Sequence, residues 1–219
     1  LLQQALPFTK SEHAKKRLAQ NLATVRSYVD GAKIDRFFAK WNVLDDADNV
    51  EDNPDDGLPI ARQLLRDART IISEANELEV SSESFDRTAF ADGLANRIQG
   101  CLIAYANKTG DYAACLPIQV QCEQVAVSEE IKVKIREGVR IIRGNIARDE
   151  ADKLYAGIAK LLETEMANAK REPMSGGVRA NKLIEDLSRK ITSLEALNRD
   201  GASVKIDDIR DSYAVAAIS

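Results

Sequence analysis

The stretch that decides the fold is residues 128–170, which reads SEEIKVKIREGVRIIRGNIARDEADKLYAGIAKLLETEMANAK. Its apolar side chains recur every three or four residues, a spacing that places them on one face of an α-helix. Ser128 is a good N-cap, and Glu129 and Glu130 follow in the first turn, where the helix dipole favours negative charge. The stretch therefore predicts one helix on the order of 65 Å long. Its apolar face consists of Ile131, Ile135, Val139, Ile142, Ile146, Leu154, Ile158, Leu161 and Met166.

Two glycines inside this helix leave its continuity open. Gly138 and Gly144 each weaken a helix by about 1 kcal/mol relative to alanine, which permits a bend without forcing a break. The residues Pro173-Met174-Ser175-Gly176-Gly177 then end it, and leucines and isoleucines resume at helical spacing. A second helix over 178–198 is expected to fold back antiparallel, so that the two form a long helix-turn-helix arm.

The rest of the chain also has helical periodicity. It predicts helices over about 10–29, 59–79 and 85–107, the first preceded by a capping box that begins at Thr9. Residues 34–41 contain the densest aromatic cluster and are expected to be a helix end docked in the core. Residues 111–127, which contain Pro117, permit a short strand or a helical turn, and an irregular connection or short helix is favoured.

An acidic stretch separates the first two of these helices. Residues 45–57 read DDADNVEDNPDDG, with seven carboxylates and no basic residue, which predicts a loop. Calcium binding of the EF-hand kind is not supported, because the sixth position from Asp45 is Val50 instead of glycine and the twelfth is Asp56 instead of glutamate. A solvated acidic linker is favoured over a metal site.

Together these patterns predict an all-α fold, an antiparallel bundle of five or six helices. Residues 1–127 would form the N-terminal part of the bundle with the acidic loop. Residues 128–219 would form the long hairpin and an apolar tail over 203–219 that docks on the bundle or on a neighbour. The two parts are expected to form one continuous domain.

Composition restricts the classes of partner. The chain has 219 residues, 44% of them hydrophobic, which suffices for a core. Its net charge of −4 and pI of about 5.3 argue against an overall electrostatic attraction to nucleic acid or anionic membrane. The longest apolar runs, 101–106 and 214–218, are far shorter than the roughly 20 residues of a membrane span. A soluble or peripheral protein is expected, and its compartment is not predicted, since the sequence begins at Leu1 without a recognisable targeting segment.

The three cysteines, Cys101, Cys115 and Cys122, are an odd number in one short segment. Reduced cysteines packed as small hydrophobic residues are favoured over the alternative, a bridge between Cys115 and Cys122. The only histidine, His13, stands among Lys15, Lys16 and Arg17, where no nucleophile is near in sequence. No zinc, di-iron or phosphate-loop motif occurs. We therefore predict no catalytic residue, no cofactor and no metal, and expect that the chain is not an enzyme.

One basic row has the spacing of a contact surface. Lys132, Arg136, Arg140 and Arg143 follow one another at steps of four, four and three on the long helix. The row suits phosphates or an acidic partner, including residues 45–57 of the same or another copy. Nearby glutamates and the absence of interleaved aromatic residues favour a solvated or internally paired face.

Three hypotheses of function follow. The first is a non-catalytic structural or accessory subunit of a larger assembly, such as a peripheral subunit of a membrane complex or a particle component, acting through helix-mediated contacts with other protein subunits. The alternative is a nucleic-acid-binding or coat protein that uses the basic row, which the net charge does not favour. The third is an enzyme whose scattered site residues form no recognisable motif.

Overall fold

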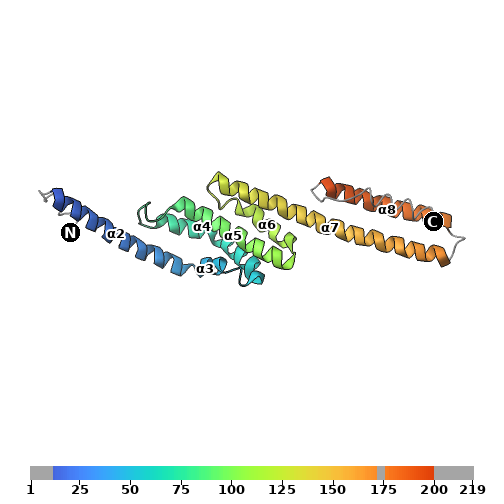
Figure 1. Ribbon diagram of the computed structural model, residues 1–219, viewed down its shortest axis with the longest axis horizontal. Coiled ribbons are helices and arrows are strands. Elements are labelled where there is room, and N and C mark those ends of the chain that lie inside the picture. Colours follow the sequence, from blue (N-terminus) through green and yellow to red (C-terminus); the bar gives the residue numbers. More distant parts are fainter. Residues whose placement is uncertain (1–11, 172–175, 200–219) are drawn as a thin grey trace. The chain divides into compact units, whose positions relative to one another are not determined.

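The computed structural model describes residues 12–171 and 176–199, and these residues are helical almost throughout (Figure 1). The described ranges contain seven α-helices, one 3₁₀-helix and no β-strand, which confirms the predicted all-α class. The predicted capping box at Thr9 and the tail 203–219 lie outside the described residues. The helices are α2 (Glu12–Lys40), α3 (Asn42–Asp48), η2 (Pro54–Asp56), α4 (Gly57–Glu77), α5 (Arg87–Thr109), α6 (Tyr112–Cys122), α7 (Glu129–Arg171) and α8 (Gly176–Arg199).

The chain divides into two compact units, residues 1–137 (unit 1) and residues 138–219 (unit 2). The division falls inside α7, which the sequence patterns assigned whole to the second part of the chain. The helix itself continues through Gly138 and Gly144 without a break. Within the described residues, no helix is both long and apolar enough to cross a membrane.

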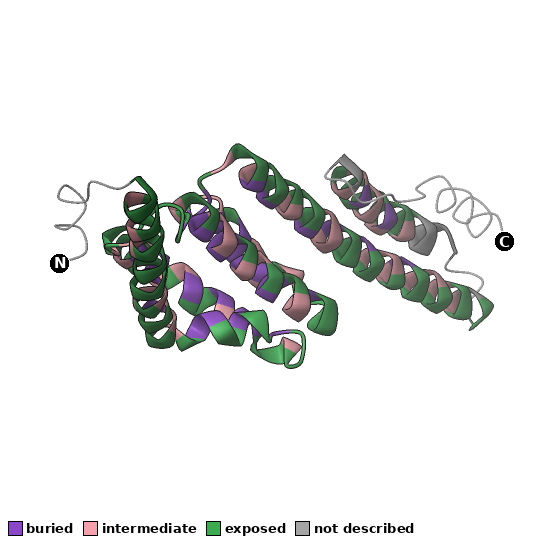
Figure 2. Cartoon of the chain, turned by 60° about the vertical axis from the view of Figure 1, so that its left-hand side comes forward, coloured by how far each residue is buried: buried purple, intermediate pink, exposed green. Residues whose placement is uncertain are grey.

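The core of unit 1 lies between α4 and α5. The apolar stripe predicted for residues 59–79 packs against α5, so that Leu64 and Ile71 are fully buried together with Leu94 and Ile98 (Figure 2). Asp86 caps α5 by accepting a hydrogen bond from the Ala89 amide at 3.0 Å. The predicted bounds of both helices agree with the structure to within about two residues, the usual uncertainty of helix ends.

The segment around Pro117 forms an ordered helix, α6. Asp111 is its N-cap and accepts from the Ala114 amide at 3.1 Å. Pro117 lies inside the helix, where it removes one backbone hydrogen bond. Tertiary contacts offset that loss: the buried Gln119 amide donates to the Ile135 carbonyl oxygen of α7 at 3.2 Å. The short-helix alternative for 111–127 is therefore the one that the structure contains.

The acidic stretch 45–57 is only partly a loop, which corrects the sequence prediction. Its first residues belong to α3, and η2 follows shortly before α4 begins. Val43, Leu44, Ala47 and Val50 recur at helical spacing and are buried, whereas the carboxylates between them are exposed. The density of acidic residues concealed this apolar pattern.

The first helix is longer than predicted, because α2 continues through Gly31 to Lys40. Its last third is fixed to the rest of unit 1. Phe37 is buried, with its ring centroid 5.4 Å from that of Phe90 and 6.3 Å from that of Phe85. Lys33 donates to the Glu79 carbonyl oxygen at 2.7 Å, and Lys40 pairs with Glu74. The predicted docking of 34–41 thus occurs as part of one continuous helix.

Asp30 provides a further contact between α2 and the turn before α5. Its carboxylate accepts from the Ser81 amide at 3.0 Å and from the Ser84 hydroxyl at 2.9 Å. The bond from the Ser81 backbone, and after it the bond from Ser84, lower the pKa of Asp30 below its ordinary value. The charged carboxylate is thus the form that holds α2 in place.

We expect Asp30→Asn to lower the free energy of unfolding at pH 7, and the difference from the parent to shrink in acid. A carboxyl group with a depressed folded-state pKa stabilises the fold above its ordinary pKa of about 4, and this contribution disappears as the pH falls through the folded-state value. Urea unfolding of both proteins at pH 7 and about pH 3 measures the effect. Asp35→Asn, at an exposed position of α2, is the control and should match the parent at both pH values.

Unit 2 contains the residues of α7 after Glu137 and the helix α8. Its core consists of Ala147, Ala151 and Ile158 from α7 packed with Leu187 and Leu194 from α8. The predicted arm of two helices, 128–170 and 178–198, is therefore confirmed as two helices in contact. One residue of the predicted apolar face differs, since Met166 near the end of α7 is half-exposed.

Candidate functional site

The basic row on α7 is partly occupied by the protein's own carboxylates. Arg136 donates to Glu123 and to Glu129, each at 2.8 Å, and these hydrogen bonds raise the pKa of its guanidinium above the ordinary value. Lys132 is half-buried, and its positive charge interacts with the carboxylate of Asp92. Arg140 and Arg143 are exposed further along the same helix. At Arg136 the structure contains internal pairing, and phosphate or partner contact by the row stays a prediction.

The three cysteines belong to the core of unit 1. All are unpaired and buried. The Cys115 thiol donates to the Leu102 carbonyl oxygen at 3.7 Å, and the Cys122 thiol donates to that of Ala95 at 3.3 Å. Burial raises the pKa of Cys101 and of Cys115 to about 11 and that of Cys122 to about 12. Because a nucleophilic thiol needs a lowered pKa, these side chains act as small hydrophobic residues that join α6 to α5.

The remaining candidates for chemistry are dispersed. His13 is exposed near the beginning of α2. Over residues 12–171 and 176–199, no three His, Cys, Asp or Glu side chains come together in a way that could hold a metal ion. Asp48, in the acidic stretch, makes a two-bond ion pair with Arg97 of α5, with distances of 2.7 and 2.9 Å. The carboxylates of this stretch therefore contribute surface charge.

An apolar stripe on α2 is exposed. Leu18, Leu22, Val25 and Val29 follow one another at steps of four, three and four, which places them on one face of the helix; we call them the α2 stripe. Leu18 and Leu22 are half-buried, whereas the exposed fractions of Val25 and Val29 are 48% and 50%. Tyr28, beside the stripe, is 78% exposed. Figure 2 shows most of α2 as exposed.

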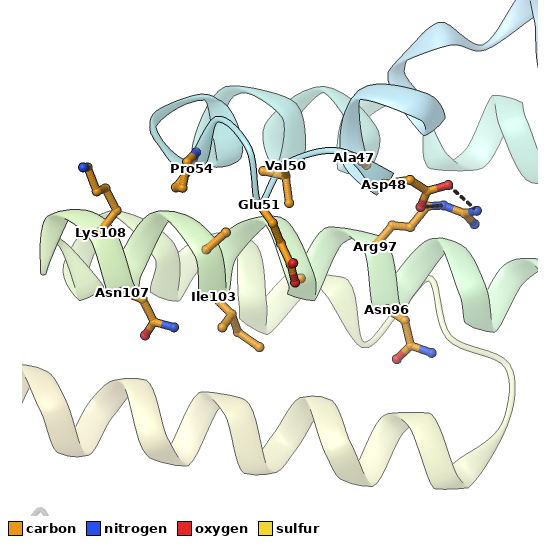
Figure 3. Close-up of a pocket in the computed structure, with 12 residues that line it drawn as sticks. Ala47, Asp48, Val50, Glu51, Pro54, Asn96, Arg97, Ile103, Asn107 and Lys108 are labelled. Carbon is orange, nitrogen blue, oxygen red and sulfur yellow. Dashed lines mark hydrogen bonds and ion pairs between the residues drawn. The ribbon is translucent and has the colours of Figure 1, made fainter.

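A groove lies in unit 1 between α3, the turn after it and α5 (Figure 3). Its volume is about 750 Å³. The apolar side chains of Ala47, Val50 and Ile103 line it, and Ile103 is 53% exposed. The ion pair of Asp48 and Arg97 lies at one end in the figure, and Lys108 lies at the other. The lining also includes Glu51, Pro54, Asn96, Gly100, Ala104 and Asn107.

Neither surface was predicted from sequence as a functional site. The periodicity of the α2 stripe predicted a helix over about 10–29, and no role was assigned to its apolar face. Ile103 lies in the apolar run 101–106, so its periodicity gave no sign that it lines an open groove. The one sequence feature that marks the groove is the acidic stretch, which forms the wall of the groove opposite α5.

Comparison of the chain with protein-family models, with curated proteins and with solved structures finds no match.

Proposed function

We propose that this chain is a non-catalytic subunit of a larger protein assembly and that the α2 stripe is the face that binds its partner. The observation that carries the proposal is the α2 stripe, which runs from Leu18 to Val29 and has half-exposed valines at Val25 and Val29. Scattered apolar side chains are common on protein surfaces, but four at coiled-coil spacing form a continuous seam. A helix with such a seam is stabilised when a partner covers it.

The anchoring of α2 supports this proposal. The contacts of Asp30, Lys33 and Phe37 hold its last third, and the α2 stripe lies before them in the sequence. An anchored helix base presents the preceding turns in a fixed direction, which reduces the entropy lost on binding. Full burial of a valine contributes roughly 1.5 kcal/mol, and Val25 and Val29 are about half-exposed, so a partner that covers both would contribute about 1.5 kcal/mol in all.

The test compares two double variants of the full chain. Val25→Asp with Val29→Asp places charge on the α2 stripe, whereas Gln20→Asp with Ser27→Asp places the same charge on exposed positions of the opposite helix face. In gel filtration of extract from the native source, we expect the parent and the control to elute in a large complex. The stripe variant should elute as a free chain.

Two results would contradict the proposal: elution of the parent as a free chain, or equal loss of the complex in the control variant. Nuclease treatment distinguishes a protein assembly from the alternative function, nucleic-acid binding. A complex that disappears with nuclease and with raised salt would support nucleic-acid binding by the basic row. A protein assembly should survive nuclease.

A further inference from the structure

The groove in unit 1 has an exposed apolar side chain, Ile103, and one wall that belongs to the acidic stretch. The seven carboxylates of residues 45–56 are all exposed. Of the two basic side chains in the lining, Arg97 is paired with Asp48, and Lys108 lies at the opposite end of the groove. A ligand that fits this groove needs an apolar face to cover Ile103 and positive charges that face the acidic stretch.

The α2 stripe has this complementary chemistry. At about 100° per residue, Lys15 and Arg26 flank the stripe on one side and Arg17 flanks it on the other. Residues 12–29 contain four lysines and arginines against one carboxylate, Glu12, which pairs with Lys15 at 2.7 Å. The segment is thus an apolar seam between positive flanks.

We propose that the α2 stripe of one copy docks in the groove beside the acidic stretch of a second copy of this chain. The inference rests on the proposed function and specifies the partner of the α2 stripe. Because stripe and groove are different surfaces, every copy offers one of each, and the contact is heterologous. Such contacts either close into a ring or continue as an open chain of copies.

An exchange of charges in the full-length chain tests this contact. One triple variant reverses the charges beside the stripe: Lys15→Glu, Arg17→Glu and Arg26→Glu. The other reverses three carboxylates of the acidic stretch, of which Glu51 lines the groove: Glu51→Lys, Asp52→Lys and Asp55→Lys. Sedimentation velocity should show that the parent self-associates and that association weakens with salt. Each triple variant alone should associate at least about tenfold more weakly, whereas an equimolar mixture of the two should associate again.

Matched variants separate the contact from general effects of charge. Asp149→Lys, Asp152→Lys and Glu163→Lys make the same charge change on exposed positions of unit 2 and should leave self-association at the parental level. Gly100→Leu fills the groove without a change of charge, because a Cβ atom at this position meets nothing within 4 Å. It should weaken association, and Gly100→Ala should not. All variants should keep the helical circular dichroism of the parent.

Three results would overturn the inference: a parent that is monomeric at every concentration, triple variants that associate like the parent, or a mixture that does not associate. Failure here is distinguishable from failure of the proposed function. If the parent does not self-associate but loses a complex with another protein on Val25→Asp with Val29→Asp, the subunit proposal stands and the second-copy inference fails. If that double variant leaves every assembly intact, the subunit proposal fails.

Discussion

Leu187→Asp is expected to unfold the helical pair of unit 2. Leu187 is fully buried between α8 and α7, in a core that has four other buried side chains among the described residues. Loss of a buried leucine costs about 2–5 kcal/mol, and a carboxylate buried without a partner adds several more. The sum is comparable to the roughly 5–15 kcal/mol that stabilises a typical domain. Thermal unfolding followed by circular dichroism should show lost helical signal or a separate transition at much lower temperature.

Ile184→Asp provides the matched control for this substitution. Ile184 lies one turn away on the same helix and is 46% exposed. Its carboxylate can remain in water, so we expect a change in unfolding free energy within about 1 kcal/mol. Equal melting curves for Leu187→Asp and the parent would show that α8 does not pack as described.

Gly57→Ala is the second substitution with a large expected effect. Gly57 is buried at the first residue of α4, where a Cβ atom would overlap the carbonyl oxygen of Cys101 and approach Tyr105 Cβ to 3.2 Å. Because the nearest atom is backbone, α4 and α5 would have to separate. Overpacking of this kind costs about 3 kcal/mol, more than alanine gains in helix propensity. Urea unfolding should show a clearly lower midpoint.

A second glycine is expected to respond in the opposite direction. Gly31 lies inside α2, and a Cβ atom there meets nothing within 4 Å. Gly31→Ala should therefore stabilise the protein by about 0.5–1 kcal/mol through helix propensity and a less flexible unfolded chain. If Gly57→Ala stabilised the protein as well, the close approach of α4 to α5 at Gly57 would be refuted.

The sequence was informative wherever one helix face is apolar and continuous. The stripes of α4 and α7 predicted helices because burial of one face imposes the same period on the sequence. The sequence was less informative at α6, because a proline inside a helix usually ends it. The helix tolerates Pro117 because Gln119 and Cys122 pack against other helices, which local sequence does not show. At residues 43–50 the local density of charge outweighed four apolar positions.

The candidate surfaces were harder to predict than the helices. Periodicity identifies which residues share a helix face, but it does not show whether another element covers that face. Val25 and Leu64 both belong to clean stripes, yet Leu64 is fully buried and Val25 is half-exposed. The groove beside Ile103 depends on where the turn after α3 lies relative to α5, a long-range property that no local pattern contains.

The burial of all three native thiols makes the folded chain a convenient host for site-specific probes. With pKa values of about 11 to 12, Cys101, Cys115 and Cys122 hold almost no thiolate at neutral pH and lie out of reach of maleimide reagents. A cysteine introduced at the exposed Ser27 would therefore be labelled selectively in the native protein. A fluorophore or spin label there would follow the surroundings of α2 in real time, without prior removal of any native cysteine.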